Sequence, residues 1–258
     1  MPGSDAISES GALLTHSLAD DAAAARRRLL PGLTQLEARA QRIDLQLMSI
    51  WFSIGSALFM AGAAMSILGR GPADATFAIG AVCFTTAAFI QWRAAVSHLP
   101  RWRAAHPGKR RAWANPDWLA AVVQLVGTLE FNVMTIRGMS IAVTDTSAYD
   151  HGVWRPDVVG SALFLISSLI ALHPINGALR HALVRGRSKA IVYLNLAGSV
   201  FFGISAVGAL GMGGGVKNNA LNNVGTLLGG ACFLVASVLL WPRRTPTAAD
   251  QPAGSAAA

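Results

Sequence analysis

The chain has 258 residues, of which 53% are hydrophobic and 13% charged, and its mean hydropathy is +0.44. Soluble domains carry about 25% charged residues, so this composition excludes an ordinary soluble domain and indicates a membrane protein. The formal net charge is +8, but the basic residues are spread over short connections between apolar segments. Because they form no stripe or reading motif, we expect no nucleic-acid partner.

Residues 1–43 are polar and rich in alanine, and we expect them to form a cytoplasmic tail. Towards the end of this tail, Leu33, Leu36 and Ile43 are spaced with charges between them, which is typical of a short helix lying on a membrane surface. A solvated, partly disordered leader is the alternative. At the other end, residues 243–258 are expected to be a disordered cytoplasmic tail.

Six apolar segments between these tails are each long enough to cross the roughly 30 Å hydrocarbon core of a bilayer, which takes about 20 helical residues. They cover residues 45–68, 74–95, 117–138, 157–173, 189–211 and 221–241. The sequence therefore predicts an all-α polytopic membrane protein, with a six-helix membrane domain over residues 44–242.

The distribution of Lys and Arg predicts the orientation in the membrane. Five lie in the N-terminal tail, six in the second connection, four in the fourth and two at the C-terminus, so 17 of 21 share one side. The other four are Arg70, Arg137, Arg155 and Lys217. By the positive-inside rule, the 17-residue side is cytoplasmic. We therefore expect a multi-pass protein of the cell (plasma or inner) membrane with both termini in the cytoplasm.

Each apolar segment carries the same pattern of a glycine, a small residue, two variable positions and a phenylalanine. The glycine and the phenylalanine one turn later share a helix face, and membrane helices associate by close approach over small residues, so we expect a packing seam. A glycine-rich ligand or ion path is the alternative. The motif residues are Gly55, Phe59, Gly80, Phe84, Gly127, Phe131, Gly160, Phe164, Gly198, Phe202, Gly229 and Phe233.

A longer pattern appears when the segments are taken in pairs. In the second helix of each pair, the motif Phe is followed three and four residues later by a small pair, and Pro and Arg follow the helix. This repetition predicts three parallel hairpins, over about residues 45–95, 117–173 and 189–241. Three equally oriented hairpins would close into a six-helix bundle with approximate threefold pseudosymmetry about the membrane normal.

These hairpins, with centres such as GSALF, resemble the YrhK-type membrane domain, a two-helix module of bacterial membrane proteins whose activity is not established. The resemblance covers about residues 45–241 as repeated units and implies fold and location only. The middle pair departs most from the pattern, because Glu130 stands inside its motif and Asn132 follows it.

Polar residues within the apolar segments form a candidate polar membrane site. Glu130 should face the bundle, be protonated or have a partner, and Arg137, seven residues later on the same face, is the expected ion-pair partner. Gln124 and Asn195 stand three residues before the motif glycine in the third and fifth helices, which favours interhelical hydrogen bonds. Together with Glu130 and Asn132 they are alternatively the lining of a polar cavity.

The longest external connection contains His151 beside Asp145, Asp150 and Asp157. These side chains suit a bound cation, but we expect a solvated loop anchored at the interface by Trp154. Elsewhere the chain has no nucleotide, hydrolase, zinc or redox motif, and Cys83 and Cys232 occupy equivalent small positions of the repeat. We therefore expect no enzyme, no cofactor and no metal site.

The expected function is that of a structural or regulatory membrane module. The second connection is basic and contains Trp102, Trp113 and Trp118, which favours contact with anionic lipid. A homo-oligomer or a protein partner is left open. The alternative is a small permease or channel with a polar path around Glu130, because acids within membranes often mark proton or cation routes.

Overall fold

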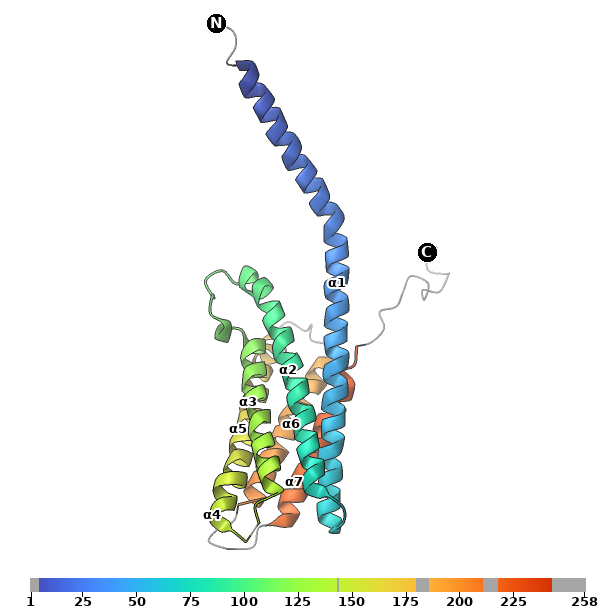
Figure 1. Cartoon of the computed structure of the whole chain (residues 1–258), viewed down its shortest axis with the longest axis vertical. Helices are drawn as coiled ribbons and strands as arrows, with labels where there is room; N and C mark the ends of the chain where they lie inside the picture. The colour runs from blue at the N-terminus through green and yellow to red at the C-terminus, as the bar shows by residue number, and fades with distance from the viewer. Residues whose placement is uncertain (1–4, 143, 180–185, 211–217, 243–258) are drawn as a thin grey trace, which may run out of the picture. The chain divides into compact units, whose positions relative to one another are not determined.

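The computed structural model describes residues 5–142, 144–179, 186–210 and 218–242, and over these residues the chain is helical with no strand (Figure 1). Six helical segments are long and apolar enough to cross a membrane, which confirms an all-α polytopic membrane protein. The chain divides into two compact units, Met1–Ile43 and Asp44–Ala258. The first unit is helical from Asp5, and the second contains the bundle. The predicted tail over residues 243–258 lies outside the described residues.

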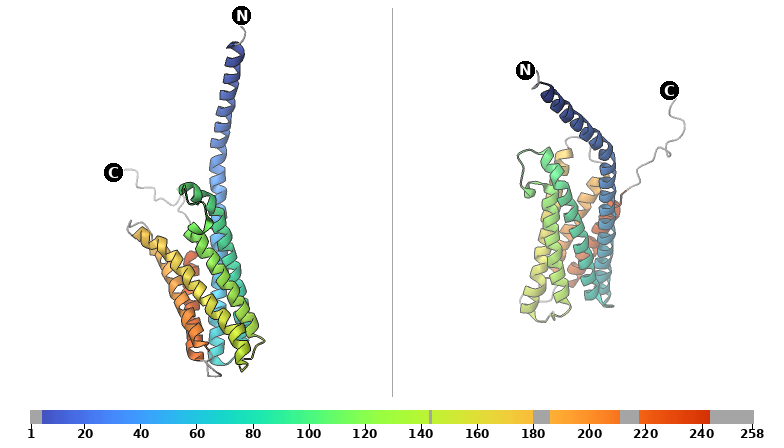
Figure 2. Two further views of the ribbon diagram at one scale, coloured as in Figure 1. Left: turned by 90° about the vertical axis from the view of Figure 1, so that its left-hand side faces the viewer. Right: turned by 45° about the horizontal axis from the view of Figure 1, so that its top comes forward.

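The membrane-crossing helices run side by side in the second unit (Figures 1 and 2). Short helices join on to two of them: η1, a 3-10 turn, precedes α3, and α4 and the π-helical turn η2 lead directly into α5. In chain order the elements are α1 (Asp5–Leu68), α2 (Ala73–Ala105), η1 (Ala112–Ala114), α3 (Pro116–Gly138), α4 (Thr146–Tyr149), η2 (Asp150–Trp154), α5 (Arg155–Leu179), α6 (Gly186–Gly208) and α7 (Asn219–Leu240).

Local chemistry explains where these helices begin and end. The side chain of Asn115 accepts a hydrogen bond of 2.9 Å from the backbone N–H of Trp118, with Pro116 as the first residue of α3. Two helices run on through a proline that the repeat pattern places after the helix. α2 contains Pro100, and α5 extends past Pro174. Within a helix, proline removes one backbone hydrogen bond and its ring crowds the carbonyl of the preceding turn, so the helix continues through it only at a cost in stability.

Each hairpin is held by a reciprocal exchange of glycine and phenylalanine. A Cβ atom on Gly55 would lie 2.5 Å from the ring of Phe84, and one on Gly80 would lie 3.2 Å from the ring of Phe59. The glycine backbones also touch, since the Gly80 carbonyl is 3.0 Å from the Gly55 Cβ position. The same exchange joins Gly127 with Phe164, Gly160 with Phe131, Gly198 with Phe233 and Gly229 with Phe202.

The six motif phenylalanines meet in one buried cluster. Each is only 3–5% exposed, and every membrane-crossing helix contributes one ring. Neighbouring rings lie with centroids 5.0 Å apart for Phe131 and Phe164 and 5.4 Å apart for Phe202 and Phe233. Such pairs contribute about 0.5–1.5 kcal/mol beyond the burial of their area. The cluster fills the space between the six helices.

Hydroxyl groups connect neighbouring hairpins. Ser168 of α5 and Ser199 of α6 share a hydrogen bond of 2.9 Å, and Thr85 of α2 donates to the backbone carbonyl of Thr128 in α3 at 3.4 Å. Ser53 of α1 and Ser237 of α7 share a hydrogen bond of 2.8 Å across the ends of the chain. The bundle is therefore a closed ring in the order α1, α2, α3, α5, α6, α7. Similar hydroxyl contacts join each pair of neighbouring hairpins, as a threefold arrangement requires. The threefold symmetry itself stays a prediction.

We expect Gly55→Ala to lower the stability of the full chain in detergent by about 1–3 kcal/mol, because the added methyl overlaps a buried ring and a fixed backbone carbonyl. The matched control is Gly203→Ala in α6, where a Cβ atom meets nothing within 4 Å. Helical alanine is favoured over glycine, so this control should be neutral or slightly stabilising. Thermal unfolding measures both changes. Equal melting temperatures for the two variants would contradict the close packing of the hairpin.

Candidate functional site

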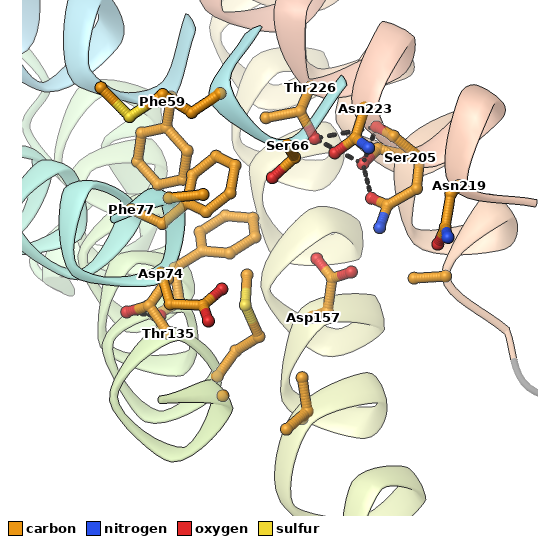
Figure 3. A pocket seen from close by; sticks show the side chains of 18 of the residues that line it. Phe59, Ser66, Asp74, Phe77, Thr135, Asp157, Ser205, Asn219, Asn223 and Thr226 are labelled. Atoms are coloured by element: carbon orange, nitrogen blue, oxygen red, sulfur yellow. Dashed lines mark hydrogen bonds between the residues drawn. The ribbon is translucent and has the colours of Figure 1, made fainter. Parts of the chain in front are cut away.

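A cavity of about 470 Å³ lies at one end of the bundle (Figure 3). It is lined by the α1–α2 turn, by the last turns of α3 and α6, and by the first turns of α5 and α7. Phe59, Phe131 and Phe202 of the central cluster also line it. The cavity therefore extends from the end of the bundle down to the phenylalanine cluster.

One wall of the cavity is a polar network between α6 and α7. The hydroxyl of Ser205 lies 2.7 Å from the side-chain oxygen of Asn222 and 2.7 Å from the hydroxyl of Thr226. The two helices approach closely here because Gly225 leaves room: a Cβ atom on it would lie 2.9 Å from the backbone carbonyl of Phe201. The close approach brings Ser205 of α6 within hydrogen-bond distance of Asn222 and Thr226 of α7.

The lining of the cavity also carries two carboxylates. Asp157 in the first turn of α5 is 8% exposed, whereas Asp74 in the first turn of α2 is exposed. Tyr149 lines the cavity together with both carboxylates. In Figure 3 the Asp157 carboxylate stands between Asp74 and the polar network of Ser205. Arg70, on the exposed α1–α2 turn, also lines the cavity.

The connection between α3 and α5 ends in the short helices α4 and η2. Residues 144–147 are exposed, as a solvated loop would be, but the end of the connection is buried at Gly152 and Val153, where the prediction of a solvated loop is wrong. Trp154 donates from its indole N–H to the backbone carbonyl of Ala206 at 3.1 Å, which ties η2 to α6. Gly152 is buried, with its Cβ position 2.6 Å from Ile141. Asp157, which follows this connection, is buried at the cavity. The described part of the chain contains no group of three or more His, Cys, Asp and Glu side chains that would hold a metal ion.

Three of the predicted polar residues, Gln124, Asn132 and Asn195, make hydrogen bonds inside the bundle. Gln124 accepts a weak hydrogen bond of 3.4 Å from Ser167 of α5, and Asn132 donates to Thr85 of α2 at 2.5 Å. The side-chain oxygen of Asn132 is buried and has no hydrogen-bond partner among the residues described. The backbone carbonyl of Asn195 accepts from Ser199 at 2.9 Å.

Glu130 and Arg137 are not brought together. Within the described ranges no ion pair joins them, and the guanidinium of Arg137 lies instead 3.6 Å from the Cβ position of Gly152. Glu130 is half-buried beside Gly160, in the contact between α3 and α5. Neither these two residues nor Gln124, Asn132 and Asn195 line the cavity. The structure thus places its cavity away from the polar path that the sequence suggested.

The cavity residues follow the same repeat that gave the motif. Phe77, Asp157 and Thr226 each stand three residues before the motif glycine of the second helix in their hairpin, and all three line the cavity. Aligning the hairpins at this position would have found two polar side chains facing the bundle axis. Comparison of the chain with protein-family models, with curated proteins and with solved structures finds no match in any of the three.

An open cavity predicts unequal thiol reactivity in a variant from which both native cysteines have been removed. A cysteine replacing Asn223, which lines the cavity, should react readily with a small methanethiosulfonate reagent. A cysteine replacing Ser56, which is 0% exposed, should react only after denaturation. Mass spectrometry of the labelled full chain in detergent measures both. Protection of the cysteine at 223 would contradict an accessible cavity.

Proposed function

We propose that the chain is a structural or regulatory module of the cell membrane that docks to anionic lipid through its α2–α3 connection. The module carries no catalysis of its own, and both termini are cytoplasmic. The proposal depends on one observation: a basic, tryptophan-bearing connection is exposed at one end of a bundle whose axis is filled.

The α2–α3 connection combines charge with an amphipathic aromatic side chain. Lys109, Arg110 and Arg111 are exposed, and the indole of Trp113 is 58% exposed. The guanidinium of Arg111 lies 4.8 Å above the centroid of the Trp113 ring, which holds the two side chains together. Tryptophan prefers the headgroup region of a bilayer, and each nearby basic residue gains about 1 kcal/mol at an anionic surface.

This connection and the cavity are at opposite ends of the bundle, because α2 begins at the cavity and ends at the connection. The side of the membrane that holds this connection and both termini carries 17 Lys and Arg residues, and the other side carries 4. By the positive-inside rule, this difference supports a cytoplasmic location for the connection and both termini. The cavity then opens to the outside of the cell. The phenylalanine cluster lies between the two ends, so a continuous pore along the axis would require the six rings to separate.

We further propose that the three hairpins are copies of one YrhK-like unit, arranged with approximate threefold pseudosymmetry. The repeated glycine–phenylalanine exchange supports this proposal. The hydroxyl-bearing residue that follows the motif glycine in α1, α3 and α6 supports it as well. Ser56, Thr128 and Ser199 are all fully buried, and each hydroxyl donates to its own helix backbone.

The lipid proposal predicts that the double variant Arg110→Glu, Arg111→Glu binds phosphatidylglycerol about tenfold or more weakly, since two favourable contacts become repulsive. Native mass spectrometry of the detergent-solubilised full chain, titrated with phosphatidylglycerol or phosphatidylcholine, measures the number of retained lipids. The control is Arg155→Glu, an exposed residue at the cavity end. Unchanged phosphatidylglycerol binding by the double variant would reject this docking surface.

A further inference from the structure

We propose that the cavity binds a small organic cation, an amine or quaternary ammonium compound, between its carboxylates and its phenylalanine rings. The volume of about 470 Å³ lies within the range of about 300–1,000 Å³ that is typical of small-molecule sites. Such sites combine apolar walls with a few polar groups that fix orientation. This proposal stands independently of the lipid-docking proposal, because the two concern opposite ends of the bundle.

The charges of the lining favour a cation over an anion. Asp157 is a carboxylate in a buried position of the lining, where a cation brought beside it would make a charge contact that water and salt screen only weakly. Asp74 adds a second carboxylate nearer the mouth. Among the described residues of the lining, Arg70 is the one basic side chain, and it lies on the exposed turn. A cation placed beside Asp157 would therefore meet negative charge at depth and positive charge only at the rim.

The aromatic walls favour an organic cation over a metal ion. Phe59, Phe77, Phe131 and Phe202 line the cavity and come from three hairpins. The face of an aromatic ring attracts an alkylammonium group, and the attraction is stronger when water is excluded. A hard metal ion instead needs a shell of six or more oxygen ligands, to which phenylalanine contributes nothing. The cavity is also far larger than a single ion requires.

The polar wall gives the ligand a direction. The side chains of Asn219 and Asn223 line the cavity beside the network of Ser205, Asn222 and Thr226. These groups present both hydrogen-bond donors and acceptors. A ligand with its ammonium group between Asp157 and the rings would direct a hydroxyl or second polar group toward this wall. Amino alcohols have this pairing of groups.

Calorimetric titration of the full chain in detergent tests the inference with matched probes. Choline and benzylamine are the cationic probes, 3,3-dimethyl-1-butanol is the uncharged isostere of choline, and calcium chloride is the inorganic control. We expect saturable binding of at least one cationic probe. The uncharged isostere cannot make the charge contact with Asp157, so it should bind at least about tenfold more weakly, which corresponds to about 1.4 kcal/mol.

Two aspartates provide the comparison within the chain. Asp157→Asn should weaken binding of the cationic probe at least about tenfold. Asp150→Asn, at a half-buried aspartate paired with Arg155 outside the lining, should leave it unchanged. If Asp157→Asn unfolds in a thermal melt, Phe77→Leu replaces it and should also weaken cation binding. The inference is overturned by cationic probes that bind no tighter than about 10 mM. Equal binding by the lining and control variants, or calcium binding alone, overturns it as well.

Discussion

Contact between glycine backbones and phenylalanine rings is the interaction on which the rest of the structure depends. In a bilayer, apolar side chains gain nothing by leaving lipid, so helices associate only where their surfaces fit closely. Each motif glycine creates a gap in its helix, and the phenylalanine of the paired helix fills it, as Gly55 and Phe84 show. Large aliphatic side chains such as Ile54 and Val82 remain exposed on the outer faces, where lipid surrounds them.

The same packing separates the two ends of the molecule. Because the six rings fill the axis, no open path joins the basic connection at one end to the cavity at the other within the described part of the bundle. At one end Arg111 and Trp113 form a surface that suits lipid headgroups. At the other end Asp157 and Thr226 line a cavity. The buried serine and threonine hydroxyls join the helices without opening the axis, since each has a backbone or hydroxyl partner, as Ser199 does.

The spans and their pairing were predictable because apolar length and a fixed repeat are properties of the sequence alone. The ends of the helices were less predictable, since no feature of the neighbouring sequence shows that α2 continues through Pro100. The cavity was missed for a different reason. Glu130 is conspicuous because it interrupts an apolar run, whereas Asp157 stands next to a polar connection and reads as solvated. In the fold the end of that connection packs against the bundle, where Trp154 donates to Ala206, 52 positions further along the chain, and Asp157 is buried.

The ring closure between α1 and α7 is the most direct test of this account, because the two contacting serines are 184 residues apart in the chain. Cysteines replacing Ser53 and Ser237, in a chain without its native cysteines and with a protease site between α5 and α6, should form a disulfide on oxidation. The two fragments would then stay linked after cleavage until a reductant is added. The control pairs Ser53→Cys with Val238→Cys, which is 58% exposed and faces outward. Linkage of the control pair alone, or of neither pair, would contradict a closed six-helix ring.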